Sequence, residues 1–365
     1  MKQSRTVILF LLTILVFLFL ANVVVYEAAL LALGISRFSF SIMAILGIFG
    51  VSFILSSILG MFFCDIFTRT YYLLSMIWVG LFGYLFFASG LYVLLFPYLG
   101  NSAKFFALIL FILTIATSAY GVLHARKLFI KNITVKLPGL PEIWQKRKVV
   151  WISDLHVGQI NGEKYIGRVI KELKIISPDI LFIGGDLFDG PTAPKILDYI
   201  SQFLEFLVPL GMYFITGNHE GYRNSELFLQ KIKETGIRVL NDEKIVLDNL
   251  QIIGVDFKTT AKNDDFKKVL TNLAINKDMP SILLKHEPRY IETAREAGVF
   301  FQISGHVHRA QQWPLEYFAR LVYGRFASGL KWAGKMQVYT SSGTGTWGPP
   351  LRVLTNSEIV VFKFT

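Results

Sequence analysis

Metal-binding and proton-transferring residue types stand directly after short apolar runs in the second half of this chain. The run "VVWIS" leads into "DLH", "ILFIGG" into "DLFDG" and "MYFIT" into "GNHE". Further along, "SILLK" is followed by "HEP" and "VFFQIS" by "GHVH". Imidazole and carboxylate groups without a thiolate favour Mn²⁺, Fe or Zn²⁺ over an all-oxygen calcium site. The candidate ligands and acid–base groups are Asp154, His156, Asp186, Asn218, His219, Glu220, His286, His306 and His308.

The number of these groups predicts more than one metal ion. A lone histidine after a strand is more often a structural residue than a ligand, but five of the six histidines in the protein fall in these clusters. Seven or eight candidate ligands are too many for one zinc ion, which takes four. Two ions that share a carboxylate would use them all. We therefore expect a dinuclear metal centre assembled from separate segments of the chain.

Strands must position these groups, since each cluster follows an apolar run rich in β-branched and aromatic residues. Helices are expected between the first strands, at about 162–176, at about 195–208 and from about 224 onward. Strands that alternate with helices of this length indicate βαβ units, and ligands gather at the carboxyl ends of such strands. A hairpin-like run and further strands follow towards the C-terminus. The expected fold at 148–365 is an α/β domain with a two-sheet β core flanked by helices, an α/β/β/α sandwich.

The first 124 residues have a different composition. They contain five Lys or Arg and two acidic residues, against 32 and 24 in the rest of the chain. Their apolar runs are long enough to cross a bilayer core, which needs roughly 20 residues, whereas a cleaved signal peptide would be shorter and would stand alone. We expect an all-α transmembrane region at 1–124 and a basic linker at 125–147. The predicted spans are at about 6–26, 39–63, 71–98 and 105–123.

Basic residues flank these spans mainly on one side. Lys2, Arg5, Arg69, Arg126, Lys127 and Lys131 fall on that side, and Arg37 and Lys104 on the other. Because Lys and Arg accumulate on the cytoplasmic side, we expect a multi-pass membrane protein with its catalytic domain in the cytoplasm. Glu27 falls at the end of the first span, where it either lies at the headgroup level or marks a functional site in the membrane.

Charge also bears on the partners of the protein. The net charge is +11, and the segment "KLPGLPEIWQKRK" after the last span is suited to anionic lipid headgroups. Nucleic acid is the alternative partner, but no recognition-helix pattern or repeated basic–aromatic interleaving is visible, so no specific nucleic-acid binding is expected. Cys64 is the only cysteine, which excludes disulfides within the chain and metal sites built on cysteine.

The order "DLH…GD…GNHE…H…GHVH" over about 150–310 resembles the five-block signature of the calcineurin-like metallophosphoesterases. The tail "YTSSGTGTWGPPLR" is similar to that of a membrane-associated branch with YkuE- and YaeI-type phosphoesterases, some of which act on lipid A precursors. The resemblance implies hydrolysis of a phosphodiester, pyrophosphate or phosphomonoester by metal-bound hydroxide, and the anchor suggests a lipid-linked substrate. It also implies a ligand set: Asp154, His156 and His308 for one ion, Asn218, His286 and His306 for the other, and Asp186 as the bridge.

The motif "GNHE" receives separate roles from the same resemblance. Gly217 would allow a tight turn at the metal centre, and Asn218 would supply a neutral amide oxygen. His219 would donate a proton to the leaving group instead of binding metal. Glu220 would accept a hydrogen bond from the other ring nitrogen of His219 and fix its tautomer.

Other residues and other functions are less specified. Asp189 is expected to be a loop-turn aspartate and Glu287 a solvated side chain. Arg309 either places a cation beside the substrate or is solvated, and Trp347 packs either on the substrate or in the core. The alternative to an enzyme is a catalytically silent scaffold or regulatory domain attached to a membrane sensor or transporter, although the complete set of expected ligands favours hydrolysis. The sequence does not indicate an oligomeric state.

Overall fold

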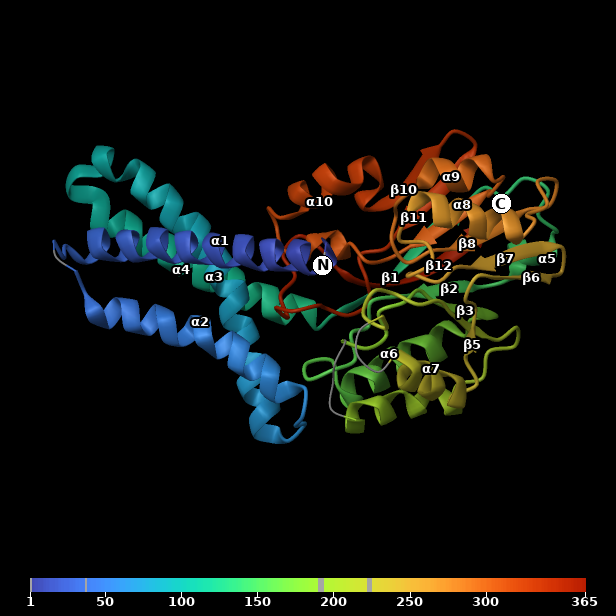
Figure 1. Ribbon diagram of the computed structural model, residues 1–365, viewed down its shortest axis with the longest axis horizontal. Coiled ribbons are helices and arrows are strands. Elements are labelled where there is room, and N and C mark those ends of the chain that lie inside the picture. Colours follow the sequence, from blue (N-terminus) through green and yellow to red (C-terminus); the bar gives the residue numbers. More distant parts are fainter. Residues whose placement is uncertain (1, 37, 190–193, 222–224) are drawn as a thin grey trace.

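The structure of the chain is a computed structural model that describes residues 2–36, 38–189, 194–221 and 225–365. It consists of a helical N-terminal region and an α/β domain, and the helices project from one end of that domain (Figure 1). The four long helices are α1 Lys2–Leu33, α2 Phe40–Gly60, α3 Ile66–Leu99 and α4 Ala103–Ala125, with the short 3₁₀ helix η1 Gly100–Ser102 between the last two.

Among the residues that the structure describes, two helical stretches are long and apolar enough to cross a membrane. They are Phe40–Gly60 and the nearly continuous Ile66–Ala125, which contains α3 and α4, and both are mostly exposed. At 1.5 Å per residue, the 21 residues of α2 extend about 30 Å, the thickness of a bilayer core. Asp65 starts α3 as its N-cap, because its carboxylate accepts hydrogen bonds from the backbone N–H groups of Phe67 and Thr68.

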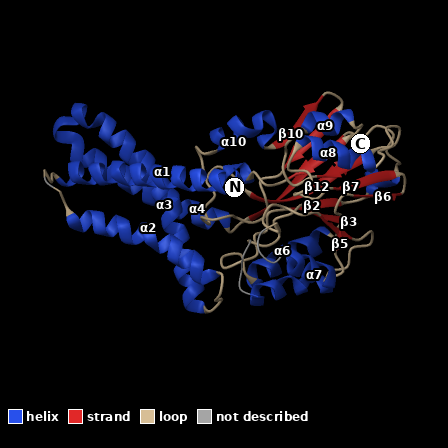
Figure 2. Cartoon of the chain, in the orientation of Figure 1, coloured by secondary structure: helices blue, strands red, loops and turns tan. Residues whose placement is uncertain are grey.

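The α/β domain contains two six-stranded mixed sheets. The first has the order β1-β12-β2-β3-β4-β5 and the second β10-β11-β9-β8-β7-β6. Figure 2 shows the strands packed as a central block with helices outside. The first sheet comprises β1 Leu128–Val135, β2 Val149–Ile152, β3 Ile180–Ile183, β4 Met212–Phe214, β5 Arg238–Val239 and β12 Ser357–Phe364. The second comprises β6 Glu243–Leu247, β7 Leu250–Gly254, β8 Ser281–Leu284, β9 Phe301–Ser304, β10 Gly329–Ala333 and β11 Met336–Thr340.

Alternation along the strands builds three apolar layers. In β2, Val150 and Ile152 belong to the cluster between the first sheet and its helices, while Val149 and Trp151 belong to the cluster between the two sheets. Side chains of a strand point alternately to its two faces, so each short strand contributes to two layers. The first sheet is covered by α6 Glu163–Ile176, η2 Pro194–Glu205 and α7 Ser225–Glu234, and the second by α8 Asn263–Asn272 and α9 Ile291–Glu296. The expected two-sheet sandwich is confirmed.

Two local expectations differ from the structure. The helix expected at 195–208 is the 3₁₀ helix η2. The segment 125–147, expected as a linker, contains β1, which pairs in parallel with β12 over its whole length. It also contains the short helix α5 Ile143–Lys146, where the side chain of Trp144 is fully buried. Arg126 and Lys127 are therefore all that separates α4 from the sheet.

The helical region packs directly on loops of the domain. The side-chain amide of Gln159 donates hydrogen bonds to the carbonyls of Gly60 (2.8 Å) and Phe63 (2.6 Å) at the end of α2. The backbone N–H of Arg352 donates to the carbonyl of Gly121 in α4 at 3.0 Å. Both contacts involve backbone groups, so they fix where the domain sits at the ends of the helices.

Candidate metal centre

The predicted ligands converge at one edge of the sandwich. They follow β2, β3 and β4, which are neighbours in the first sheet, and β8 and β9, which are neighbours in the second. In each of three groups, one potential ligand atom per residue lies within 4.8 Å of the others. The groups are Asp154, His156 and His308; His156, Asp186 and His219; and Asp186, His286 and His306. Five segments far apart in the sequence thus form one site.

The first half of the site contains two imidazoles that face each other. The Nε2 atoms of His156 and His308 are 3.0 Å apart, and Asp154 Oδ1 lies 3.6 Å from His308 Nε2. Two ring nitrogens at this distance can share at most one proton, and the remaining lone pairs are directed into a common space. A cation between the three side chains would satisfy these lone pairs.

The second half is organised by backbone contacts. Nδ1 of His286 donates a hydrogen bond to the carbonyl of Gly184 at 2.7 Å, so Nε2 is the ring nitrogen that a cation could bind in place of a proton. That Nε2 lies 3.2 Å from Asp186 Oδ2 and 3.2 Å from Asn218 Oδ1. Nδ1 of His306 is 2.8 Å from the same amide oxygen. The arrangement places an amide oxygen, a carboxylate and two imidazoles around one position.

Asp186 lies between the two halves. Its Oδ2 atom is 3.2 Å from Nε2 of His286 on one side and 3.8 Å from Nε2 of His156 on the other. Its Oδ1 atom accepts a hydrogen bond from the backbone N–H of His219 at 2.8 Å. This carboxylate therefore occupies the position that a bridging ligand requires.

The backbone at the site is unusual in a way that fits a ligand set. Asp154, His156, Asp186, His306 and His308 all have φ between +46° and +69°. Residues other than glycine adopt this left-handed region rarely, at a cost of about 1–3 kcal/mol each, and mainly at functional sites. The tight reversals turn each side chain towards the shared centre immediately after its strand.

Glycines allow the loops to approach the carboxylates. A Cβ atom on Gly217 would overlap the Asp186 carboxylate, and one on Gly305 would overlap the Asp154 carboxylate. Neither glycine has a positive φ, so the first residues of "GNHE" and "GHVH" are restricted by close contact and not by turn geometry.

The electrostatics of the site favour bound cations. Burial lowers the pKa of His306 to about 3 and that of His308 well below its usual value, so both rings are neutral at pH 7 and can offer lone pairs. Burial opposes protonation of His286 too, but the Asp186 carboxylate outweighs it and raises the pKa of His286 to about 10. The buried carboxylates thus stabilise positive charge at this position. These donor atoms fit a pair of divalent cations.

Glu220 has a different role from the one predicted. Its carboxylate accepts hydrogen bonds from the backbone N–H groups of Asp186 (2.9 Å), Leu187 (2.8 Å) and Gly217 (2.8 Å). It is buried and ties the loop after β3 to the loop after β4. The residue therefore holds the backbone that carries Asp186 and Asn218, instead of orienting a histidine ring.

The acidic side chain beside the histidine rings is Asp189. Its Oδ1 atom is 3.3 Å from Nδ1 of His156 and 3.9 Å from Nδ1 of His219. A carboxylate at this position keeps the proton on Nδ1 of His156 and directs the lone pair of Nε2 towards the site. The expectation of a plain loop-turn aspartate is wrong, because the loop after β3 turns back over both rings.

Three further residues line the edge of the site. Trp347 is 54% exposed, and its ring centroid is 6.1 Å from that of His219, so it belongs to the mouth of the site and not to the core. Arg309 forms an ion pair with Glu316 at 2.8 Å. Glu287, expected to be solvated, is buried and accepts a hydrogen bond from the hydroxyl of Tyr323 at 2.9 Å.

Arg352 is a residue that sequence reasoning missed. Its side chain is fully buried, and its guanidinium donates hydrogen bonds to the carbonyls of Ser342 (2.7 Å) and His308 (3.5 Å). Burial lowers its pKa to about 10, which leaves it charged at neutral pH. The sequence offered only its place in the run "GTGTWGPPLR" as a signal.

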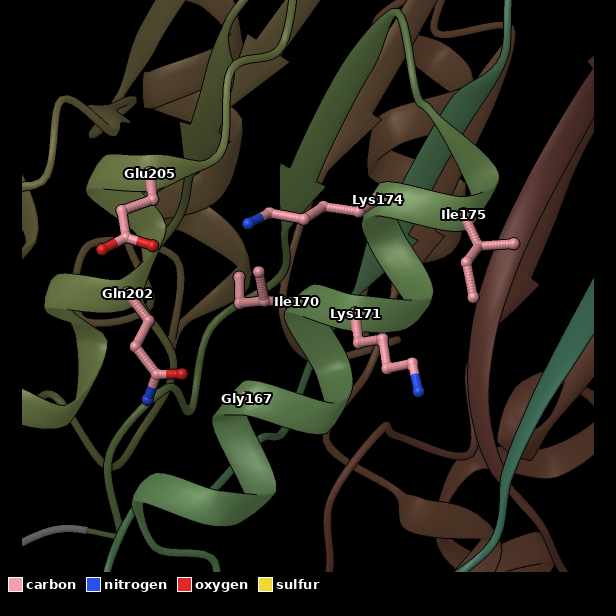
Figure 3. Close-up of a pocket in the computed structure, with 7 residues that line it drawn as sticks. All are labelled: Gly167, Ile170, Lys171, Lys174, Ile175, Gln202 and Glu205. Carbon is pink, nitrogen blue, oxygen red and sulfur yellow. The ribbon is translucent and has the colours of Figure 1, made fainter.

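A groove of about 470 Å³ lies away from this centre, between α6 and η2. Figure 3 shows Lys174 extending from α6 towards η2, which carries Gln202 and Glu205, while Lys171 points away from η2. The groove is lined by helix residues over the first sheet, and the candidate ligands lie at the strand ends instead.

Comparisons with known proteins agree with this geometry. The sequence pattern of the calcineurin-like phosphoesterase family matches residues 147–310. An uncharacterised metallophosphoesterase of Aquifex aeolicus is 30% identical over 256 residues, which cover 68% of this chain and 96% of the relative. The uncharacterised metallophosphoesterase YkuE of Bacillus subtilis is 27% identical over 240 residues, which cover 63% of this chain and 82% of the relative.

Some relatives are longer than this chain. A "transmembrane protein with metallophosphoesterase domain" of Danio rerio is 26% identical over 265 residues, or 68% of this chain and 60% of the relative. The matched part of this chain spans 61–62% of the length of the relatives from Helicobacter pylori and Campylobacter jejuni.

Proposed function

Because the chain belongs to the calcineurin-like metallophosphoesterases, we propose that it is a membrane-anchored hydrolase that cleaves a phosphate ester with the help of two divalent cations. The substrate is a phosphodiester, a pyrophosphate or a phosphomonoester. The observation that carries the proposal is the convergence of the histidine and aspartate groups around Asp186. The alternative of a silent scaffold would not require a complete set of inward-facing donors.

The proposed ligand set follows the two halves of the site. Asp154, His156 and His308 would hold one cation. The second would be held by Asn218, His286 and His306, with Asp186 between the two. Such a pair, whether of Mn²⁺, Fe or Zn²⁺, supplies Lewis-acid chemistry: it binds phosphate oxygens and lowers the pKa of an attacking water.

His219 is the proposed general acid. Its Nε2 atom faces the centre, 4.0 Å from Asp186 Oδ2, and its Nδ1 atom faces Asp189. Burial lowers the pKa of His219, and the Asp186 carboxylate partly offsets this effect. In this position Nε2 can donate a proton to the leaving-group oxygen, a contribution of typically about 10²–10⁴-fold in rate. Asp189 would stabilise the protonated ring.

Contacts between the helical region and the loops of the site support the proposal that the substrate reaches the site from the membrane. Gln159, which binds the end of α2, lies three residues after the ligand His156. The loop that carries Trp347 reaches α3 and α4 through Leu351, which packs so closely that a Cβ atom on Gly80 would overlap it and one on Gly121 would touch it. We propose that α1–α4 form a multi-pass anchor with the catalytic domain in the cytoplasm, and that a lipid-linked phosphate ester is the substrate.

The direct test is hydrolysis by the purified full-length protein in detergent. We expect turnover of bis-p-nitrophenyl phosphate with Mn²⁺, and loss of turnover in an Asp186→Ala variant that binds metal less tightly. Phospholipid and nucleotide mixtures incubated with both proteins would identify the natural substrate class. Equal turnover by the two proteins across Mn²⁺, Fe²⁺ and Zn²⁺ would reject hydrolysis at this centre.

A further inference from the structure

The helix α10 Glu316–Tyr323, which follows the last candidate ligand, exposes its apolar face instead of burying it. Every residue of α10 is at least partly exposed. Its large apolar side chains are strongly exposed: Leu321 is 82% exposed, Val322 61% and Phe318 59%. Surface helices of soluble domains direct such residues to the core. The apolar face of α10, with Tyr317, Phe318, Leu321 and Val322, is instead directed away from the domain.

The polar side chains of α10 hold it to the domain. Glu316, on the opposite face of the helix, binds Arg309 at 2.8 Å. The hydroxyl of Tyr323 donates to the buried carboxylate of Glu287 at 2.9 Å, and its ring centroid lies 6.1 Å from that of His306. Polar contacts at both ends therefore fix which face of the helix remains outside.

The base of α10 lies at the domain ends of the membrane helices. The backbone N–H of Trp313 donates to the carbonyl of Val353 at 3.2 Å, and Val353 contacts the Cβ position of Gly121 in α4. The side-chain oxygen of Gln312 lies 4.0 Å from the Cβ position of Gly83 in α3. In Figure 1, α10 lies on the side of the domain nearest the helical region. The exposed apolar face of α10 therefore lies next to the exposed apolar surface of the N-terminal helices.

We propose that α10 lies in the interfacial layer of the bilayer, as a monotopic element beside the active site. An amphipathic helix in this position places its apolar face in the boundary between headgroups and acyl chains. Trp313 and Tyr317 are the aromatic residues that favour this layer. The exposed Arg325 can reach anionic headgroups, whereas Arg320 pairs with Glu316 at 3.7 Å. Since Tyr323 contacts the carboxylate next to His306, the membrane surface would adjoin the metal centre. The proposal rests on the membrane anchoring put forward above and does not depend on the hydrolysis.

Site-directed fluorescence quenching tests this placement in the full-length chain. Cys64, the only cysteine, is replaced by Ser, which keeps a polar atom beside the hydroxyl of Tyr199. An environment-sensitive probe is then attached to Leu321→Cys, and the protein is placed in nanodiscs that contain nitroxide-labelled phospholipid. We expect a blue-shifted emission and quenching several-fold stronger than at the matched site Leu207→Cys, which is 90% exposed just after η2.

A third position separates the two proposals. A probe at Ile54→Cys in α2 reports whether the helices enter the bilayer at all. Quenching at Ile54 and Leu321 but not at Leu207 supports both proposals. Quenching at Ile54 alone rejects the placement of α10 and leaves the anchor intact, and no quenching at Ile54 rejects the anchor. The measurement is made in nanodiscs that carry a single chain and in nanodiscs that carry two. A blue-shifted emission at Leu321 only in the discs with two chains would show that a second copy of the chain covers α10. This result would reject the placement of α10 in the bilayer.

Discussion

Replacement of Asp189 by asparagine tests the new role that the structure gives to this residue. The substitution keeps the shape of the side chain and removes its charge, 3.3 Å from Nδ1 of His156. For two full charges at this distance and an effective dielectric constant of about 20, the interaction would be roughly 5 kcal/mol. A ring that binds a metal through its lone pair is neutral, and Asp189 is 18% exposed, so the real effect must be much smaller. Carboxylates that hold a ligating histidine contribute about 10–100-fold to metal affinity, and we expect a loss in this range.

The assay is calorimetric titration of the metal-free protein with Mn²⁺, followed by turnover of bis-p-nitrophenyl phosphate at saturating metal. Asp198→Asn makes the same chemical change at an exposed aspartate that pairs with Lys231, and it should leave both quantities unchanged. Turnover at saturating metal should also fall for Asp189→Asn, because the same carboxylate faces His219. A metal affinity within twofold of the wild type would show that Asp189 does not set the state of His156, and the reasoning would fail.

Three other substitutions test separate parts of the site. His219→Ala should reduce kcat by about 10²–10⁴-fold for esters with a poor leaving group and much less for p-nitrophenyl esters. Burial lowers the pKa of His219, so the wild-type kcat should decline as the pH rises through this lowered pKa, and this decline should vanish in the variant. Equal losses for both ester classes would contradict proton donation. Glu220→Ala leaves buried N–H groups without an acceptor and should cost about 3 kcal/mol of stability. The loss would be visible as a lower unfolding temperature in detergent. An unchanged unfolding temperature with a reduced kcat would instead indicate that Glu220 orients the ring of His219. Gly217→Ala forces a Cβ atom onto the Asp186 carboxylate and should weaken metal binding in the same titration; an unchanged affinity would mean that the loop moves freely.

The sequence predicted well which segments converge, because their signal is local. Each block consists of an apolar strand followed at once by a polar group, and the structure places the strands of Asp154, Asp186 and Asn218 side by side. The left-handed backbone at the ligands has no comparable signal, since aspartate and histidine enter that region only where the surrounding structure imposes it.

The errors arose where the outcome depends on contacts between distant segments. Glu220 stands next to His219 in the sequence, but its carboxylate meets amides of the loop after β3. Asp189 has the sequence context of a turn residue. It reaches Nδ1 of His156 only because the loop after β3 folds back over that ring. The strand β1 was read as a linker because it lacks a continuous apolar run, while its place in the sheet depends on pairing with β12 at the other end of the domain.

The two halves of the metal centre are connected to different parts of the helical face of the domain. In the first half, His156 leads within three residues to Gln159, which binds the carbonyl of Gly60, and the carbonyl of His308 accepts from Arg352, whose backbone binds Gly121. The second half is connected through Glu287 and Tyr323 to α10. A change in how α2 and α4 meet the domain should therefore act first on the proposed cation site at His156 and His308. A change in the environment of α10 should act first on the other. The bilayer would then contribute to the geometry of the catalytic centre as well as to its location.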